Sequence, residues 1–72
     1  MKIKTVVITL PESYSMRVGE LINGVKVEYI EEIRGYNGPC YIARNAEGDR
    51  LAQIHDNQFV YVDYYNPELK SK

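Results

Sequence analysis

The feature that most constrains this chain is a series of turn signals that divides its 72 residues into short segments of strand-like alternation. Asn23-Gly24 is the strongest signal, because both residues tolerate a positive φ and together favour a two-residue hairpin turn. Asn45-Ala46-Glu47-Gly48 fits a type I turn, with asparagine first and glycine fourth. Segments bounded by such turns and rich in β-branched and aromatic residues predict strands.

The pattern predicts an all-β fold built from short strands. The strands are expected at residues 2–10, 17–22, 25–33, 40–45, 50–54 and 58–64. A short helix that begins at Pro11 competes with loop and strand over residues 11–22. A β-bulge near Tyr29-Ile30 is needed to restore the alternation in the third segment. Strands at this spacing resemble in shape a small antiparallel barrel, SH3-like, with five to six short strands.

Alternation also predicts which side chains face inward in the first strands. In the first strand, the even-numbered residues from Val6 onward are expected to face the core, because they are the more apolar set. The Asn23-Gly24 turn is expected to pair Ile22 with Val25, and this pairing gives the hairpin one mainly apolar face.

Residues 40–64 are expected to form a three-stranded meander. The first turn would set Ala43 opposite Leu51, and a tip at Asp56-Asn57 would set Phe59 opposite Ile54. One face would then carry Cys40, Ile42, Ala52, Ile54, Phe59 and Tyr61. The other face would carry Tyr41, Ala43, Leu51, Gln53, Val60, Val62 and Tyr64. A slip of one residue would exchange the two sets.

Length and composition indicate one small domain over residues 1–65, with a loose tail over residues 66–72. Nine basic and ten acidic residues give a formal charge of -1, so the chain as a whole has no attraction for nucleic acid or anionic membrane. A single cysteine suits a reducing compartment, and no apolar segment is long enough to span a bilayer. We therefore expect a cytoplasmic protein without membrane contact.

Catalytic and metal-binding signals are weak. His55 is the only histidine and lies in a polar turn, where such residues have structural uses. Cys40 could act as a nucleophile activated by His55 if their strands are neighbours, but small buried cysteines are common in cores, so a structural role is favoured. Glu28, Glu31 and Glu32 form the one acidic cluster, and solvated edge charges explain it better than a metal site. No enzyme activity, cofactor or metal is expected.

Tyrosine is the unusual component. Seven tyrosines accompany one phenylalanine and no tryptophan. A chain this short cannot bury so many phenols in one core, so some must be exposed. The expected register gathers an apolar surface with tyrosines at its margin, formed by Tyr36, Tyr41, Leu51, Val60, Val62 and Tyr64. Coverage of this face by the first strand and the tail is an equally good interpretation.

The leading functional hypothesis is a small non-enzymatic protein-interaction module, such as a regulator, inhibitor or accessory subunit. It would dock on another protein, or on a second copy, through the tyrosine-edged face. The alternative is binding of a nucleotide or of single-stranded nucleic acid by aromatic stacking beside Arg34, Arg44 and Arg50. Oligonucleotide binding that weakens steeply with added salt would favour the alternative.

The leading hypothesis predicts the behaviour of a double variant. Replacing Tyr41 and Tyr64 with serine is expected to weaken association and to leave the thermal midpoint nearly unchanged, because surface substitutions seldom change stability. Sizing and thermal unfolding measure the two effects. A large loss of stability would place these side chains in the core.

Overall fold

The structure, a computed structural model, describes residues 2–36 and 38–65, and the predicted tail at 66–72 lies outside them. The described residues form a small all-β domain of eight strands without a helix. The strands are β1 Ile3–Ile8, β2 Tyr14–Arg17, β3 Leu21–Ile22, β4 Val25–Lys26, β5 Tyr29–Gly35, β6 Gly38–Arg44, β7 Arg50–His55 and β8 Val60–Tyr64. The same residues contain no helix that is long and apolar enough to cross a membrane.

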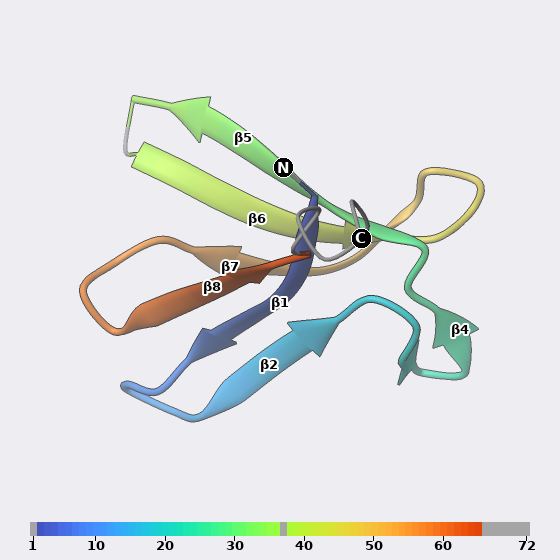
Figure 1. The fold of residues 1–72 in the computed structure, drawn as a ribbon, viewed down its shortest axis with the longest axis horizontal. Helices are drawn as coiled ribbons and strands as arrows, with labels where there is room; N and C mark the ends of the chain where they lie inside the picture. The colour runs from blue at the N-terminus through green and yellow to red at the C-terminus, as the bar shows by residue number, and fades with distance from the viewer. Residues whose placement is uncertain (1, 37, 66–72) are drawn as a thin grey trace, which may run out of the picture.

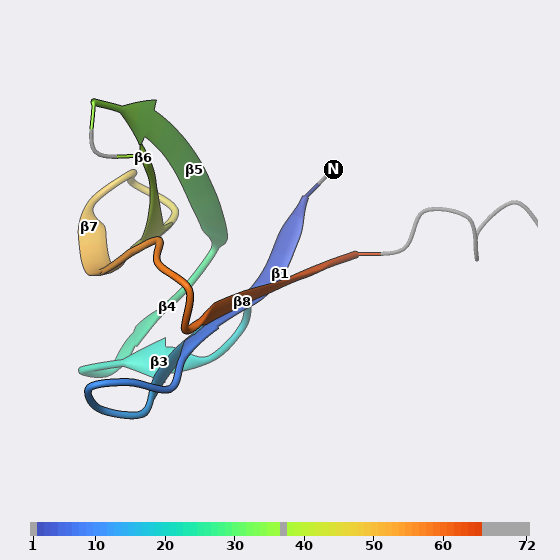
Figure 2. The same ribbon diagram turned by 90° about the vertical axis from the view of Figure 1, so that its left-hand side faces the viewer.

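The strands assemble into three antiparallel sheets (Figure 1). One sheet has the order β2-β1-β8, another the order β5-β6-β7, and β3 pairs with β4 alone. Figure 2 shows β5, β6 and β7 together on one side of the molecule, with β1 and β8 on the other. The all-β antiparallel prediction is confirmed, although eight strands replace the five or six expected.

Both predicted turns are present. Asn23 and Gly24 have φ values of 52° and 82°, and they set Ile22 opposite Val25 as expected. In the second turn, Gly48 N donates to Asn45 O at 3.0 Å. The Asn45 side chain fixes the same turn, because its Oδ1 accepts from Glu47 N at 3.0 Å and from Asp49 N at 2.8 Å.

Two predicted strands are divided in the structure. Residues 17–22 hold the end of β2 and the whole of β3, and the break contains Gly19 at a φ of 97°, which few other residues adopt. The competing helix over residues 11–22 is absent from this described stretch. Residues 25–33 are divided between β4 and β5, so the expected irregularity falls at Val27 and Glu28, just before Tyr29.

The predicted register between β6 and β7 is wrong by one residue over most of its length. Arg44 lies opposite Arg50, as the turn requires, but the ladder then shifts and Ala43 lies opposite Ala52. Leu51 is the extra residue of this β-bulge. The shift places Tyr41 opposite Ile54. Tyr41 and Ala43 therefore share a face with Ala52 and Ile54, which the prediction had placed on the opposite face.

The predicted meander is also wrong at its last strand, because β8 pairs with β1 and not with β7. Asn57 begins the turn that redirects the chain. Its Oδ1 accepts from Phe59 N at 2.7 Å, and its carbonyl accepts from Val60 N at 3.1 Å. Phe59 O then accepts from Thr9 N at 3.1 Å, which starts the β1–β8 pairing. The polar residues at 55–58 therefore form a corner between sheets.

The core lies between the two three-stranded sheets. Its buried residues are Ile3, Val6, Met16, Val27, Ile30, Tyr41, Ala43 and Ile54. Val6 and Ile8 face it, as predicted. A register irregularity between Ile3 and Thr5 allows Ile3 to enter the core as well. Without that irregularity, strict alternation would turn Lys4 inward beside Val6.

The Asn45 turn can be tested directly. Asn45→Ala removes both Oδ1 hydrogen bonds, and we expect it to lower the free energy of unfolding by about 1–2 kcal/mol. Ala46→Ser, at an exposed position of the same turn, is the matched control and should change stability little. Chemical denaturation measures both, and equal stability of the two variants would show that the side-chain bonds contribute nothing.

Candidate functional site

The structure separates the residues that the sequence placed on one binding face. Tyr41 is only 5% exposed and belongs to the core. Leu51, Val60 and Val62 are half-buried and pack against that core. Tyr36 lies on the hairpin between β5 and β6, whereas Tyr64 belongs to β8 in the other three-stranded sheet and lies opposite Ile3. Val60 and Val62 lie beside β1 in one sheet and pack against the core, so they do not form an open face with Tyr36.

The expected excess of phenols over interior positions is confirmed. Six of the seven tyrosines are exposed, and Tyr41 is the one that is buried. The exposed ones are Tyr14, Tyr29, Tyr36, Tyr61, Tyr64 and Tyr65. Two of these six line the same surface depression, which the predicted register did not reveal.

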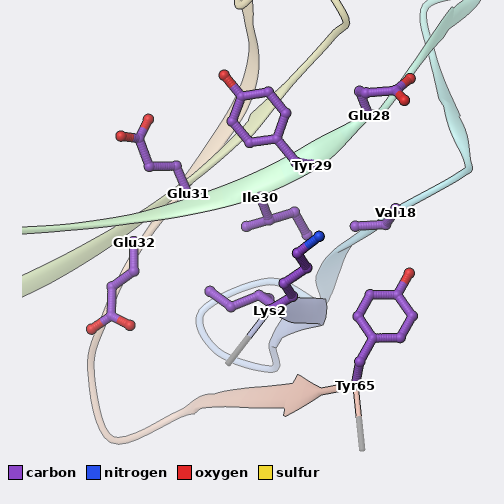
Figure 3. A pocket seen from close by; sticks show the side chains of 9 residues that line it. Lys2, Val18, Glu28, Tyr29, Ile30, Glu31, Glu32 and Tyr65 are labelled. Atoms are coloured by element: carbon purple, nitrogen blue, oxygen red, sulfur yellow. The ribbon is translucent and has the colours of Figure 1, made fainter. Parts of the chain in front are cut away.

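This depression is a groove of about 630 Å³ between β5 and the start of β1 (Figure 3). Its floor contains the buried side chains of Ile3 and Ile30. Tyr29, on β5, and Tyr65, directly after β8, lie at its margin, and Figure 3 shows the Tyr29 ring on the side of β5 away from Lys2. At this side of the groove, Tyr65 N donates to Lys2 O at 3.0 Å, which holds the end of β8 against the start of β1.

Charged side chains complete the lining of the groove. Glu28, Glu31 and Glu32 line it from β5 and the residue before it, and Lys2 is the one cation of the lining, which leaves a formal charge of 1 − 3 = −2 on the lining residues. Glu31 and Glu32 are each held by an arginine outside the lining. Arg44 Nε lies 2.8 Å from Glu31 Oε1, and Arg34 Nη2 lies 2.9 Å from Glu32 Oε2. Glu28 has no ion-pair partner among the described residues.

The backbone of β5 is open along the same groove, because β5 pairs only with β6. Arg34 lies opposite Pro39, which has no N–H, and Pro39 O accepts from Asp56 N at 3.0 Å on the β7 side. Pro39 thus offers Arg34 no hydrogen bond. Since backbone groups alternate in direction along a strand, Arg34, Glu32 and Ile30 turn their N–H and C=O groups toward the open edge.

The arginines of the nucleic-acid alternative are largely engaged. Arg44 donates to Glu31 and also to Gly48 O at 2.7 Å, and Arg34 pairs with Glu32. Arg50 is exposed and lies opposite Arg44. These three residues form no free basic surface beside Tyr41, because Tyr41 is in the core.

Cys40 and His55 do lie directly opposite each other on β6 and β7. However, His55 Nε2 is 3.0 Å from Gln53 Nε2, and an amide nitrogen can only donate, so the imidazole nitrogen accepts this bond. No hydrogen bond joins Cys40 to His55 within the described ranges. The same residues contain no cluster of histidine, cysteine and carboxylate side chains suited to a metal ion.

Among the described residues, Tyr41 is the one whose pKa is clearly shifted. Burial, followed by the nearby carboxylates of Asp56 and Glu32, raises the pKa of its phenol above the ordinary value. Tyr64 acts in the same direction, and Arg34 partly opposes them. This environment is that of an interior side chain close to one end of the core.

Sequence reasoning missed Lys2, Tyr29 and Tyr65 as groove residues. The acidic cluster on β5 was recognised, but its surroundings depend on the pairing of β1 with β8. A signal for that pairing is the matched β-branched content of the first and last strands, which local turn patterns do not use.

Comparison with known proteins supplies no relative. None of the protein-family models, curated proteins or solved structures compared with the chain matches it. The functional argument therefore depends on the geometry of the groove and of β5.

The Tyr41 pKa predicts a pH dependence of stability. The pKa of the folded state lies above the ordinary value of 10.0, so the unfolded chain loses this proton first as the pH rises. The associated stability is present below pH 10 and is lost as the pH rises through the folded-state pKa. Tyr41→Phe should reduce the loss of unfolding free energy between about pH 8 and about pH 11, measured by denaturation.

The exposed Tyr61, at 65% accessibility, offers the control. Tyr61→Phe should retain the alkaline loss of the unmodified chain. An identical pH dependence in both variants would contradict the assignment to Tyr41. Tyr41→Ser is expected to cost about 3–5 kcal/mol as a truncated core aromatic, which replaces the sequence-based expectation of an unchanged midpoint.

Proposed function

We propose that this chain is a small non-enzymatic protein-interaction module that binds an extended segment of its partner in the groove beside β5. The observation that carries the proposal is the coincidence of three features at one place. An apolar floor, two exposed tyrosines and an unpaired strand edge all border the same depression.

Each feature has a role in binding an extended chain. Outward N–H and C=O groups of Ile30 and Glu32 can pair with a partner backbone, which is the basis of strand addition. Tyr29 and Tyr65 supply contact area at low side-chain entropy cost and keep a hydroxyl for polar contacts. Ile3 and Ile30 offer a surface against which an apolar partner side chain can pack.

A protein partner agrees with the charge of the groove better than a nucleic acid does. The lining carries three carboxylates and one lysine, and Glu31 and Glu32 are paired with arginines, so Lys2 is the one cation of the lining that could bind phosphate. Arg34 and Arg44 are already paired with Glu32 and Glu31, so they also favour a protein partner over a nucleic acid.

We also infer an SH3-like barrel plan for the domain. The support is the path of the chain, in which β5, β6 and β7 form a consecutive antiparallel sheet and β8 returns to pair with β1. The β3–β4 hairpin is inserted between the two three-stranded sheets in the sequence. In this plan the groove lies where β5 and the start of β1 are neighbours but do not pair.

The proposal predicts the effect of removing the marginal phenols. A Tyr29→Ser/Tyr65→Ser variant should bind its protein partner at least about tenfold more weakly, because exposed aromatic anchors dominate such contacts. Cross-linking in extracts of the native host, quantified for each variant, identifies the partner and measures the loss. The thermal midpoint should change little, since both side chains are on the surface.

Tyr61→Ser is the matched control, because Tyr61 is exposed on β8 outside the groove lining. It should retain the full set of cross-linked partners. Equal loss in both variants would mean that the groove is not the binding site, and retention of all partners by the groove variant would refute the proposal.

A further inference from the structure

We propose that the extended segment bound beside β5 is the β5 strand of a second copy of this chain, paired antiparallel about a two-fold axis at Ile33. The inference rests on the proposed function and names the partner. It joins two three-stranded sheets, each with the order β5-β6-β7, into one continuous sheet through their β5 edges.

The unpaired backbone groups restrict how two copies can meet. Ile30, Glu32 and Arg34 point their N–H and C=O groups outward, as the position of Pro39 requires. In an antiparallel pair, hydrogen bonds join outward-facing residues of one strand to outward-facing residues of the other. A two-fold axis must therefore pass through a residue, because an axis between two residues would set outward groups against inward ones.

Charge selects one axis among the five that pass through residues 30–34 of β5. An axis at Glu31, Glu32 or Arg34 places that charged residue directly opposite the same residue of the second copy. An axis at Ile30 sets Glu28 opposite Glu32 twice. Like charges directly opposite each other destabilise a strand pair.

The axis at Ile33 gives the opposite result. Glu32 of each copy lies opposite Arg34 of the other, so two favourable cross-strand pairs form. Arg34 is free to adjust, because its side chain is 78% exposed and its present partner is the nearby Glu32 of the same strand. The four charges of these two pairs then alternate in sign around the axis, which stabilises the pairing, and Glu31 of each copy lies opposite the uncharged Gly35 of the other.

The same register accounts for two exposed apolar side chains. Ile33 is 40% exposed on the outer face of β5, and at the axis it meets its own copy. Tyr36, the most exposed tyrosine, comes opposite Ile30, whose side chain forms the floor of the groove. The hairpin end that carries Tyr36 extends away from β1 (Figure 1), so it is accessible to a second copy.

Charge-reversal variants test the register. Glu32→Arg sets arginine opposite Arg34, and Arg34→Glu sets glutamate opposite Glu32, so each variant alone should dimerise at least about tenfold more weakly. Mixed together, the two variants should form a heterodimer, because both cross-strand pairs become opposite in charge. Sedimentation equilibrium measures all three samples, and circular dichroism checks that each variant is folded.

A cysteine scan tests the position of the axis. Ile33→Cys, made in a Cys40→Ser chain because Cys40 lies opposite Ile33 on β6, should form an intermolecular disulfide on mild oxidation. Non-hydrogen-bonded antiparallel partners have Cα atoms about 4.5 Å apart, within disulfide range. Glu31→Cys in the same background is the control, since the two copies of residue 31 would be about 14 Å apart along the strands.

A chain that stays monomeric at about millimolar concentration would overturn the inference, as would disulfide formation at residue 31 and not at residue 33. In either case, loss of a different cross-linked protein in the Tyr29→Ser/Tyr65→Ser variant would leave the interaction-module function intact. A dimer that withstands both single charge reversals would also contradict the proposed register.

Discussion

The antiparallel pairing of β1 with β8 is the contact on which the rest of this structure depends. It joins strands from opposite ends of the described chain, so its formation closes a long loop at a substantial entropic cost. Burial of Val6 between the sheets and packing of Val60 and Val62 against the core offset that cost. The same pairing positions Tyr65 beside Lys2, and both residues line the groove.

Local chemistry made part of this fold predictable. The turns at Asn23-Gly24 and Asn45-Gly48 were recognised because the residues that determine them are adjacent in the sequence. The destination of β8 was missed because the Asn57 corner resembles a hairpin tip in composition, and only long-range pairing distinguishes the two. The extra residue at Leu51 exchanges the two faces of β7 relative to those of β6. It was missed because the composition of the turn does not reveal it.

For the candidate site as well, composition predicted how many residues of a kind are exposed but not which ones. The number of tyrosines alone required that several be exposed, and that requirement is met. Which tyrosine is buried depended on a one-residue register shift, so Tyr41 was assigned to a surface although it packs in the core. The acidic residues of β5 were visible in the sequence, whereas the open direction of the β5 backbone follows from Pro39 only when its partner strand is known.

The hydrogen bond between Tyr65 and Lys2 has a practical consequence for experiments on this protein. It brings both ends of the described chain to the margin of the same groove. An affinity tag or a fluorescent protein joined directly to Lys2 or to Tyr65 would therefore lie beside the groove and compete for space there.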